Sequence, residues 1–352
     1  MSTTPILVDD PVINPTTSSA GAAATFQQLR IHTPEMLDAL CVQAGQKPSV
    51  VDGLISTGSI SLAVGDSGLG KSPLFYQLGL CVAAGIPWLG MRTHRGKVLY
   101  LDYENGDLGA KSLRDSVMQH LQLQECPENF LYSQDVQNLN DLTHAVETIK
   151  PTLVVIDALR SFDSSVEENN TKAGAFFKSL RKLCQQYKVS FLLIHHIKKQ
   201  DKKGFLDARA NLETDPPLQW LNMACGARGL VNQSDVRLGV DKPSNANACL
   251  VIRGHVRIAG EVGPFYLERI FNDDEQAIGY RRLEGVEFLN NRDQQDAFDK
   301  LPLVFTFKEA KATYGRKDQA TVGFLQKCER LGILRKPGKG RPYEKVSHAA
   351  AE

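Results

Sequence analysis

Short apolar runs alternate with amphipathic stretches between residues 60 and 194 of this chain. We expect buried strands at the runs because each is short and rich in Val, Ile and Leu: 60–64, 97–102, 153–157 and 190–194. The stretches between them have helical spacing and predict helices at 71–84, 108–120, 139–149 and 173–186. This alternation is typical of an α/β fold, in which helices cover the faces of a mostly parallel sheet.

The pattern changes at about residue 228. Shorter apolar stretches at 236–240, 249–253 and 265–270 are separated by turn residues. They predict antiparallel strands added to the edge of the sheet.

The C-terminal sixth of the chain has the pattern of a separate small domain. Helices are expected at 294–300, 308–314 and 318–331, and a basic hairpin with Pro337, Gly338 and Gly340 at its tip follows. Three helices and a basic wing predict a winged-helix domain at 289–348, with its third helix shaped for a major groove. Phosphate contacts on the wing are then expected from Lys336, Lys339 and Arg341. A winged helix used only for protein contact is the alternative.

The remaining sequence sets the domain limits and the class of protein. Residues 1–24 are rich in Thr, Ser, Ala and Pro without apolar periodicity, which indicates a disordered tail, so that the core domain spans 25–288. The formal net charge of +1 means that nucleic-acid contacts would have to come from local basic patches. The seven Cys are scattered without a Cys-x-x-Cys pair, and neither a signal peptide nor a membrane span is visible. We expect a cytoplasmic protein with reduced thiols and no membrane partner.

The segment 65–72, GDSGLGKS, has the full pattern of a phosphate-binding loop between a strand and a helix. The glycines let successive backbone N–H groups point at phosphate oxygens, and the positive end of the helix faces the same place. Lys71 is expected at the β- and γ-phosphates and Ser72 on a magnesium ion. Pro73 is tolerated in the first helical turn. The predicted nucleotide-binding residues are Gly65, Asp66, Ser67, Gly68, Leu69, Gly70, Lys71, Ser72 and Pro73.

Three further strand ends carry candidate catalytic groups. Asp157 ends the LVVID run and is expected to hold magnesium beside the loop, because ligands of such sheets sit at the carboxyl ends of the strands. Glu104 follows the VLYLD run and is the candidate for the group that orients the attacking water, although an acid here can also cap the next helix. His195 and His196 end the FLLIHH run, where either could report on the γ-phosphate.

Taken in order, GDSGLGKS, YLDYEN, VVIDALRSF with EENN, LLIHH and GARGL resemble the RecA-like hexameric ATPases of the plasmid replicative helicase RepA type, relatives of DnaB and RecA. The resemblance covers residues 50 to 285. It implies a homo-oligomeric ring that uses ATP and Mg²⁺, with Glu104 as the catalytic carboxylate, Asp157 as the metal-binding acid and His195 or His196 as the histidine of the third motif. It also implies an arginine finger for the neighbouring subunit at Arg228, with Arg253 and Arg257 as the other basic groups that could reach across. In such enzymes the finger is worth about a thousandfold in rate.

A basic segment follows the last predicted strand and contains Lys198, Lys199, Lys202 and Lys203. In a RecA-like ring this loop would face the central channel and follow single-stranded DNA. The alternative is a solvated lysine run. Nearby, Phe205 and Trp220 could stack on bases or serve as packing anchors.

These motifs lead to two hypotheses about function. The first is an ATP-hydrolysing DNA motor, a replicative helicase of a plasmid, phage or mobile element that acts on single-stranded and duplex DNA. The second is an ATP-switched regulator or loader of the KaiC-like or RecA-like kind, which binds DNA through the winged helix without unwinding it. A small-molecule kinase is disfavoured because no acceptor pocket is legible in the sequence.

Overall fold

The computed structural model describes residues 33–35, 49–197, 210–226, 228–244, 248–283, 289, 292–331, 333–338 and 340–346. The chain divides into two compact units, Met1–Gln46 and Lys47–Glu352. Only residues 33–35 of the first unit are described, so the tail predicted at 1–24 lies outside the described residues. All elements below belong to the second unit.

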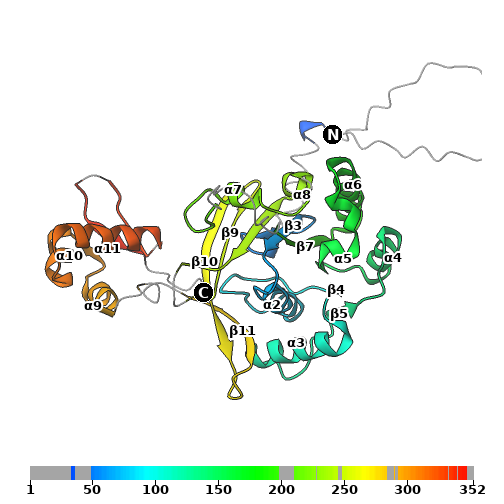
Figure 1. The fold of residues 1–352 in the computed structure, drawn as a ribbon, viewed down its shortest axis with the longest axis horizontal. Coiled ribbons are helices and arrows are strands. Elements are labelled where there is room, and N and C mark those ends of the chain that lie inside the picture. Colours follow the sequence, from blue (N-terminus) through cyan, green and yellow to red (C-terminus); the bar gives the residue numbers. More distant parts are fainter. Residues whose placement is uncertain are drawn as a thin grey trace, which may run out of the picture. The chain divides into compact units, whose positions relative to one another are not determined.

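A nine-stranded mixed sheet forms the centre of the core domain, in the order β11-β10-β9-β8-β3-β7-β6-β4-β5 (Figure 1). The strands from β8 to β5 in this order run parallel, and β9, β10 and β11 are added antiparallel beside β8. This agrees with the predicted sheet, except that the apolar pattern does not predict β5 and β11. The strands are β3 (Ile60–Gly65), β4 (Val98–Asp102), β5 (Phe130–Ser133), β6 (Leu153–Asp157), β7 (Ser190–His196), β8 (Val236–Asp241), β9 (Leu250–Val256), β10 (Gly260–Phe271) and β11 (Ala277–Arg282).

Helices cover both faces of this sheet and bury two apolar layers (Figure 1). One face packs on α2 (Lys71–Ala84) and α3 (Gly106–His120). The other packs on α4 (Leu139–Ile149), α5 (Leu159–Phe162), η1 (Ser164–Glu167), α6 (Asn170–Tyr187), α7 (Pro217–Leu221) and α8 (Arg228–Gln233). Because side chains alternate along a strand, Ile194 of β7 faces the first layer and Leu193 faces the second.

The strand register brings the predicted site residues together at the carboxyl ends of the parallel strands. Gly65 lies beside His196 across the β3–β7 pair, and Asp102 lies beside Asp157 across the β4–β6 pair. The carboxyl ends of four neighbouring strands therefore meet there, as they do in open α/β sheets generally. A separate two-stranded sheet, β1 (Ser49–Val51) with β2 (Ile55–Ser56), precedes β3.

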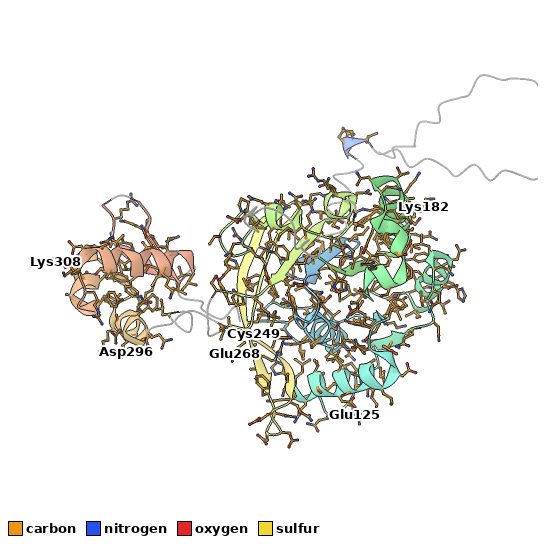
Figure 2. The ribbon with its side chains drawn as sticks, viewed as in Figure 1. Glu125, Lys182, Cys249, Glu268, Asp296 and Lys308 are labelled. Carbon is orange, nitrogen blue, oxygen red and sulfur yellow. The ribbon has the colours of Figure 1, made fainter. Side chains whose placement is uncertain are left out.

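The C-terminal residues form a small domain with its own apolar core. All three predicted helices are present, with α10 and α11 followed by a β-hairpin. Asp296 on α9 and Lys308 on α10 are labelled in Figure 2. Phe298, Phe305 and Phe324 are among the buried core residues. The elements are α9 (Arg292–Lys300), β12 (Val304–Phe305), α10 (Phe307–Tyr314), α11 (Asp318–Arg330), β13 (Leu334–Arg335) and β14 (Tyr343–Lys345). The winged-helix assignment stays a prediction.

The described residues contain neither a membrane-spanning helix nor a cluster of metal-binding side chains. Within that part of the chain, no helix has both the length and the apolar character needed to cross a membrane. The same residues contain no group of three or more His, Cys, Asp or Glu side chains placed to bind a metal ion together.

Candidate functional site

The phosphate-loop segment connects β3 directly to α2, as its sequence predicts. Gly70 has φ 92° and precedes the first helical residue, Lys71. A Cβ on Gly70 would lie 2.0 Å from the hydroxyl oxygen of Tyr280, and that hydroxyl donates to the Gly70 carbonyl at 3.1 Å. Glycine is therefore required at this position both for its backbone conformation and for its lack of a side chain.

Lys71 is buried at the base of the loop with only 5% of its surface exposed. Its ammonium donates to the carbonyl oxygens of Gly65 at 3.0 Å and Asp66 at 2.8 Å. Burial lowers the pKa of Lys71, while the carboxylates of Asp157 and Glu104 act in the opposite direction. The loop thus holds a lysine side chain against its own backbone, in position to meet an anion.

Asp157 is almost completely buried at the end of β6, with 1% exposed. The hydroxyl of Tyr100 donates to its Oδ2 at 2.9 Å, and Ser72 also hydrogen-bonds to it. Burial raises the pKa of Asp157 to about 6, even though both hydrogen bonds oppose the shift. A hydroxyl beside a carboxylate is the oxygen pair that suits Mg²⁺, so Ser72 and Asp157 fit the predicted metal site.

Glu104 is presented by a tight turn at the end of β4. The buried carboxylate of Asp102 accepts from the backbone N–H groups of Glu104 at 3.0 Å and Asn105 at 3.1 Å. The hydroxyl of Tyr76 donates to the other oxygen of Asp102 at 2.8 Å. Asp102 therefore caps the turn and leaves Glu104, whose side chain is 39% exposed, directed toward the site.

The two adjacent histidines point in different directions. His196 Nδ1 lies 3.4 Å from both Lys71 Nζ and Ser67 Oγ, and its Nε2 lies 3.3 Å from Glu104 Oε1. Because an ammonium only donates, the contact with Lys71 makes Nδ1 the acceptor, so that Nε2 carries the proton and donates to Glu104. His196 is thus the histidine that the structure places beside the predicted catalytic residues.

His195 faces the opposite side of the sheet. It is fully buried, its Nε2 lies 2.9 Å from the carbonyl oxygen of Cys225, and burial lowers its pKa. Side chains at successive strand positions point to opposite faces, so only one of the two histidines can face the phosphate loop. Of the two predicted sensors, His196 is therefore the remaining candidate.

A cavity of about 660 Å³ is lined by these groups and by residues of α3, β10 and β11. Arg269 and Tyr280, from β10 and β11, flank it, and the Arg269 guanidinium carbon lies 5.7 Å from the centre of the Tyr280 ring. This volume is typical of a site for a ligand of nucleotide size. The other cavity-lining residues of α3 and β11 are Gly109, Ser112, Leu113, Ser116, Ala277 and Gly279.

Pro73 occupies the third helical position of α2 and lines the same cavity. The first four N–H groups of a helix have no partner within the helix, so its proline breaks no helical hydrogen bond. It does remove one of the N–H groups that a helix N-terminus offers to a bound anion.

The arginines considered for a neighbouring subunit differ in their surroundings. Arg228 is exposed at the first position of α8. Arg253 instead donates to the carbonyl oxygens of Leu212, Glu213 and Asp215 at 2.9 to 3.2 Å. Arg257 donates to the carbonyl oxygens of Asn232 and Ser234. The last two arginines are therefore held within their own chain, and Arg228 stays the candidate finger.

The predicted DNA contacts are only partly visible. Lys198, Lys199, Lys202, Lys203 and Phe205 lie outside the described residues, as does Lys339. Trp220 is fully buried and its indole N–H donates to Asp241 at 2.9 Å, so of the two alternatives it is the packing anchor. On the hairpin, Arg341 is exposed, whereas Lys336 donates to the hydroxyl of Tyr343 and lies over its ring.

One family model and one curated relative match part of the core domain. Residues 28–202, just under half of the chain, match the family model AAA_25, described as an AAA domain. The DNA repair protein RadA of Synechocystis sp. (strain ATCC 27184 / PCC 6803 / Kazusa) is 24% identical over 202 residues, which are 52% of this chain. These matches support a RecA-like ATPase. The alignment spans 37% of the relative's length.

Two solved structures resemble the fold. A RadB recombinase covers 65% of this chain and 92% of its own, with 15% identity and a TM-score of 0.44. A KaiC-like protein of Pyrococcus horikoshii OT3 covers 67% of this chain and 94% of its own, with 14% identity and a TM-score of 0.42.

Several residues of this site are not part of the sequence motifs. Tyr76 and Tyr100 support the two buried aspartates, and Arg269 and Tyr280 reach the loop from β10 and β11, about 200 residues later in the chain. The period-two pattern of VLYLD places Tyr100 on the same face as Asp102, a signal that was available. No sequence signal links Tyr280 to Gly70.

Proposed function

We propose that this chain binds ATP with Mg²⁺ and hydrolyses the nucleotide to act on DNA. One observation carries the proposal: Lys71 of α2, Asp157 of β6, His196 of β7 and Glu104 of the turn after β4 line one cavity. Each has the chemistry that phosphoryl transfer to water requires, namely a phosphate-binding cation, a metal-binding acid, a base and a proton-carrying sensor.

The residues of this cavity divide the work as follows. Lys71 and the backbone N–H groups of the loop hold phosphate oxygens, and Ser72 and Asp157 hold the metal ion, which supplies charge neutralisation when bound. The Glu104 carboxylate orients a water molecule and accepts its proton. His196 restrains Glu104 through the 3.3 Å contact between its Nε2 and Glu104 Oε1. The nucleoside fills the part of the cavity between α3 and β11, beside Arg269 and Tyr280.

We further propose that the protein assembles as a ring of identical subunits. Arg228 is exposed at the start of α8, on the opposite side of the sheet from α2, which begins the nucleotide site. In the proposed ring, Arg228 completes the nucleotide site of another copy, so that hydrolysis depends on assembly, as it does for fingers supplied in trans.

The distribution of charge favours the C-terminal domain as a DNA contact. Residues 289–348 contain thirteen Lys and Arg against seven Asp and Glu, a net charge of +6, whereas the whole chain has +1. After Asp318 in its first turn, the exposed positions of α11 carry uncharged side chains, Gln319, Val322 and Gln326 among them, and Gly323 has open space where a Cβ would be. A basic domain with a largely uncharged helix face suits the major groove of duplex DNA.

The finer function is a choice between two DNA-directed roles. We favour a replicative helicase of a plasmid, phage or mobile element, in which the basic segment with Lys198 and Lys199 follows single-stranded DNA. The basic C-terminal domain favours a second role, in which the nucleotide state controls docking on duplex DNA without strand separation. The RadA relative is named for DNA repair, which is consistent with either role.

The test measures ATP hydrolysis by the full chain alone, with single-stranded DNA and with duplex DNA, alongside strand separation of a forked duplex and a native mass measurement. Glu104→Gln is the inactive control. Stimulation by single-stranded DNA together with strand separation supports the helicase. Duplex binding that changes with the nucleotide, without strand separation, supports the second role. Hydrolysis that neither DNA form changes contradicts the proposal of a DNA-directed ATPase.

A further inference from the structure

Two motifs that are far apart in the sequence pack against each other. The EENN segment, residues 167–170, runs from the end of η1 to the start of α6. The second motif contains Cys225 and Gly226, which precede α8, and Arg228 and Gly229, which begin it. Helices α6 and α8 pack on the same face of the sheet. The exposed Arg228 therefore projects from backbone that is attached to α6.

The first attachment is a hydrogen bond to the backbone immediately after Arg228. The side-chain oxygen of Asn170 accepts from the N–H of Gly229 at 2.8 Å. Gly229 lies in the first turn of α8, where N–H groups have no partner within the helix. Asn170 thus caps α8 from another helix. The approach is close, because a Cβ on Gly229 would lie 3.2 Å from that same oxygen.

The second attachment lies on the other side of Arg228. Gly226 has φ 78°, and a Cβ there would lie 2.6 Å from the Cα of Glu167. The Sγ of Cys225 lies 3.7 Å from Glu167 Oε2, and Glu167 Oε1 is buried. The side chain of Glu167 is 14% exposed. Glu167 therefore restrains the backbone two and three residues before Arg228.

The same segment is tied to the nucleotide site through the end of β7. The N–H of Cys225 donates to the carbonyl oxygen of His196 at 2.9 Å, and the carbonyl of Cys225 lies 2.9 Å from His195 Nε2. His196 in turn contacts Lys71 and Glu104. The backbone just before Arg228 is thus hydrogen-bonded to β7, the strand that ends in His196.

We infer that Glu167 and Asn170 are positioning residues that fix Arg228 in its exposed place, so that it can be presented to another copy of the chain. The inference deepens the proposed function, because the role of Arg228 in hydrolysis rests on that proposal. The positioning itself rests on the contacts around Gly226 and Gly229.

The first experiment tests how firmly the start of α8 is held, and it does not depend on ATP hydrolysis. Amide hydrogen exchange is followed by mass spectrometry in the α8 peptide of the full chain. Asn170→Ala removes the acceptor of the Gly229 N–H and is expected to speed exchange in this peptide about fivefold. Asn170→Asp keeps an oxygen acceptor and should restore the slow exchange. Asn169→Ala is the matched control, because Asn169 caps α6 itself through the N–H of Lys172 and does not hold Gly229. Equal exchange in Asn170→Ala and Asn169→Ala overturns the inference.

The second experiment measures the consequence for hydrolysis in the same variants. Asn170→Ala should lower kcat while leaving the nucleotide affinity unchanged, and the double variant with Arg228→Ala should be no slower than Arg228→Ala alone. Normal kcat in Asn170→Ala, with Arg228→Ala impaired, overturns the inference. Faster α8 exchange combined with normal turnover of Arg228→Ala upholds the positioning and instead refutes the proposed role of the arginine.

Discussion

The hydroxyl of Tyr100 donates a 2.9 Å hydrogen bond to Oδ2 of Asp157, across the pairing of β4 with β6. Tyr100 is fully buried and Asp157 is 1% exposed, so the predicted metal ligand is held by a partner that water does not reach. Because the phenol donates, the bond favours the ionised carboxylate, which is the form that binds magnesium.

Magnesium-dependent nucleotide binding should therefore depend on pH through Asp157. Burial raises the pKa of this carboxyl to about 6, so protonation competes with the metal as the pH falls through that value. The contribution of magnesium to affinity should drop by about tenfold between pH 8 and pH 5. Tyr100→Phe removes a bond that lowers the pKa and should move the midpoint to higher pH. Titrations of nucleotide with and without Mg²⁺ across this range measure both effects.

The phosphates of the nucleotide titrate in the same pH range. The contribution of Asp157 to the pH dependence is therefore obtained by comparing variants, in which the nucleotide is the same. Tyr103→Phe is the matched control, because the hydroxyl of Tyr103 donates to the backbone carbonyl of Val136 and not to an aspartate. An identical midpoint in Tyr100→Phe, Tyr103→Phe and the unmodified protein would show that Tyr100 does not set this pKa.

Lys71→Ala should abolish hydrolysis and weaken nucleotide binding. The side chain supplies the buried cation of the phosphate loop, and alanine leaves the carbonyl oxygens of Gly65 and Asp66 without their donor. Calorimetric titration and a hydrolysis assay measure the two losses separately. Unchanged affinity would mean that the lysine contacts no phosphate in the bound state.

Glu104→Gln should bind nucleotide normally and turn over about a hundredfold to ten-thousandfold more slowly, the usual contribution of a general base. Glutamine keeps the shape of the side chain, and Asp102 accepts from the backbone N–H of residue 104 in either case. The variant should therefore accumulate bound ATP, which chromatography of the isolated complex detects. Normal turnover would overturn the assignment of Glu104.

The features of the site that could be predicted from the sequence are those encoded by a few consecutive residues. The loop 65–72 and the acid after each apolar strand are encoded within a few residues, and α2 and β6 match their predicted bounds. The pattern misplaces the start of α6 at residue 173, whereas Asn169 caps the helix and begins it at Asn170. That capping asparagine was a readable signal.

The remaining features depend on contacts that no local pattern encodes. Alternation along β7 puts His195 and His196 on opposite faces, but only the packing of α2 on the sheet shows that His196 faces the loop. Tyr280 hydrogen-bonds to Gly70 from 210 residues away in the chain. The edge strand β11 packs against α2, where the side chain of Gln77 hydrogen-bonds to the backbone of Tyr280. The attachment of residues 167–170 to 225–229 is equally non-local.

Replacing Pro73 tests the cost of a missing donor in the loop. Pro73→Thr adds an N–H in the first turn of α2, beside the cavity, where helix N–H groups bind anions. Nucleotide affinity should rise by about fivefold, the value of one additional hydrogen bond. Pro217→Thr, at the first position of α7, is the control that adds an N–H to a different helix. Weaker binding by Pro73→Thr would show that the proline shapes the loop for its ligand.

Arg228→Ala should impair hydrolysis in trans. If Arg228 completes the nucleotide site of a neighbouring subunit, mixing the variant with unmodified protein before assembly should lower activity by more than the fraction of variant added. Arg257→Ala is the matched control, because that arginine donates to the carbonyl oxygens of Asn232 and Ser234 in its own chain. Steady-state hydrolysis is measured over a series of mixing ratios at constant total protein. A loss strictly proportional to the Arg228→Ala fraction would assign this arginine to its own subunit, and exposure at the start of α8 would then need another explanation.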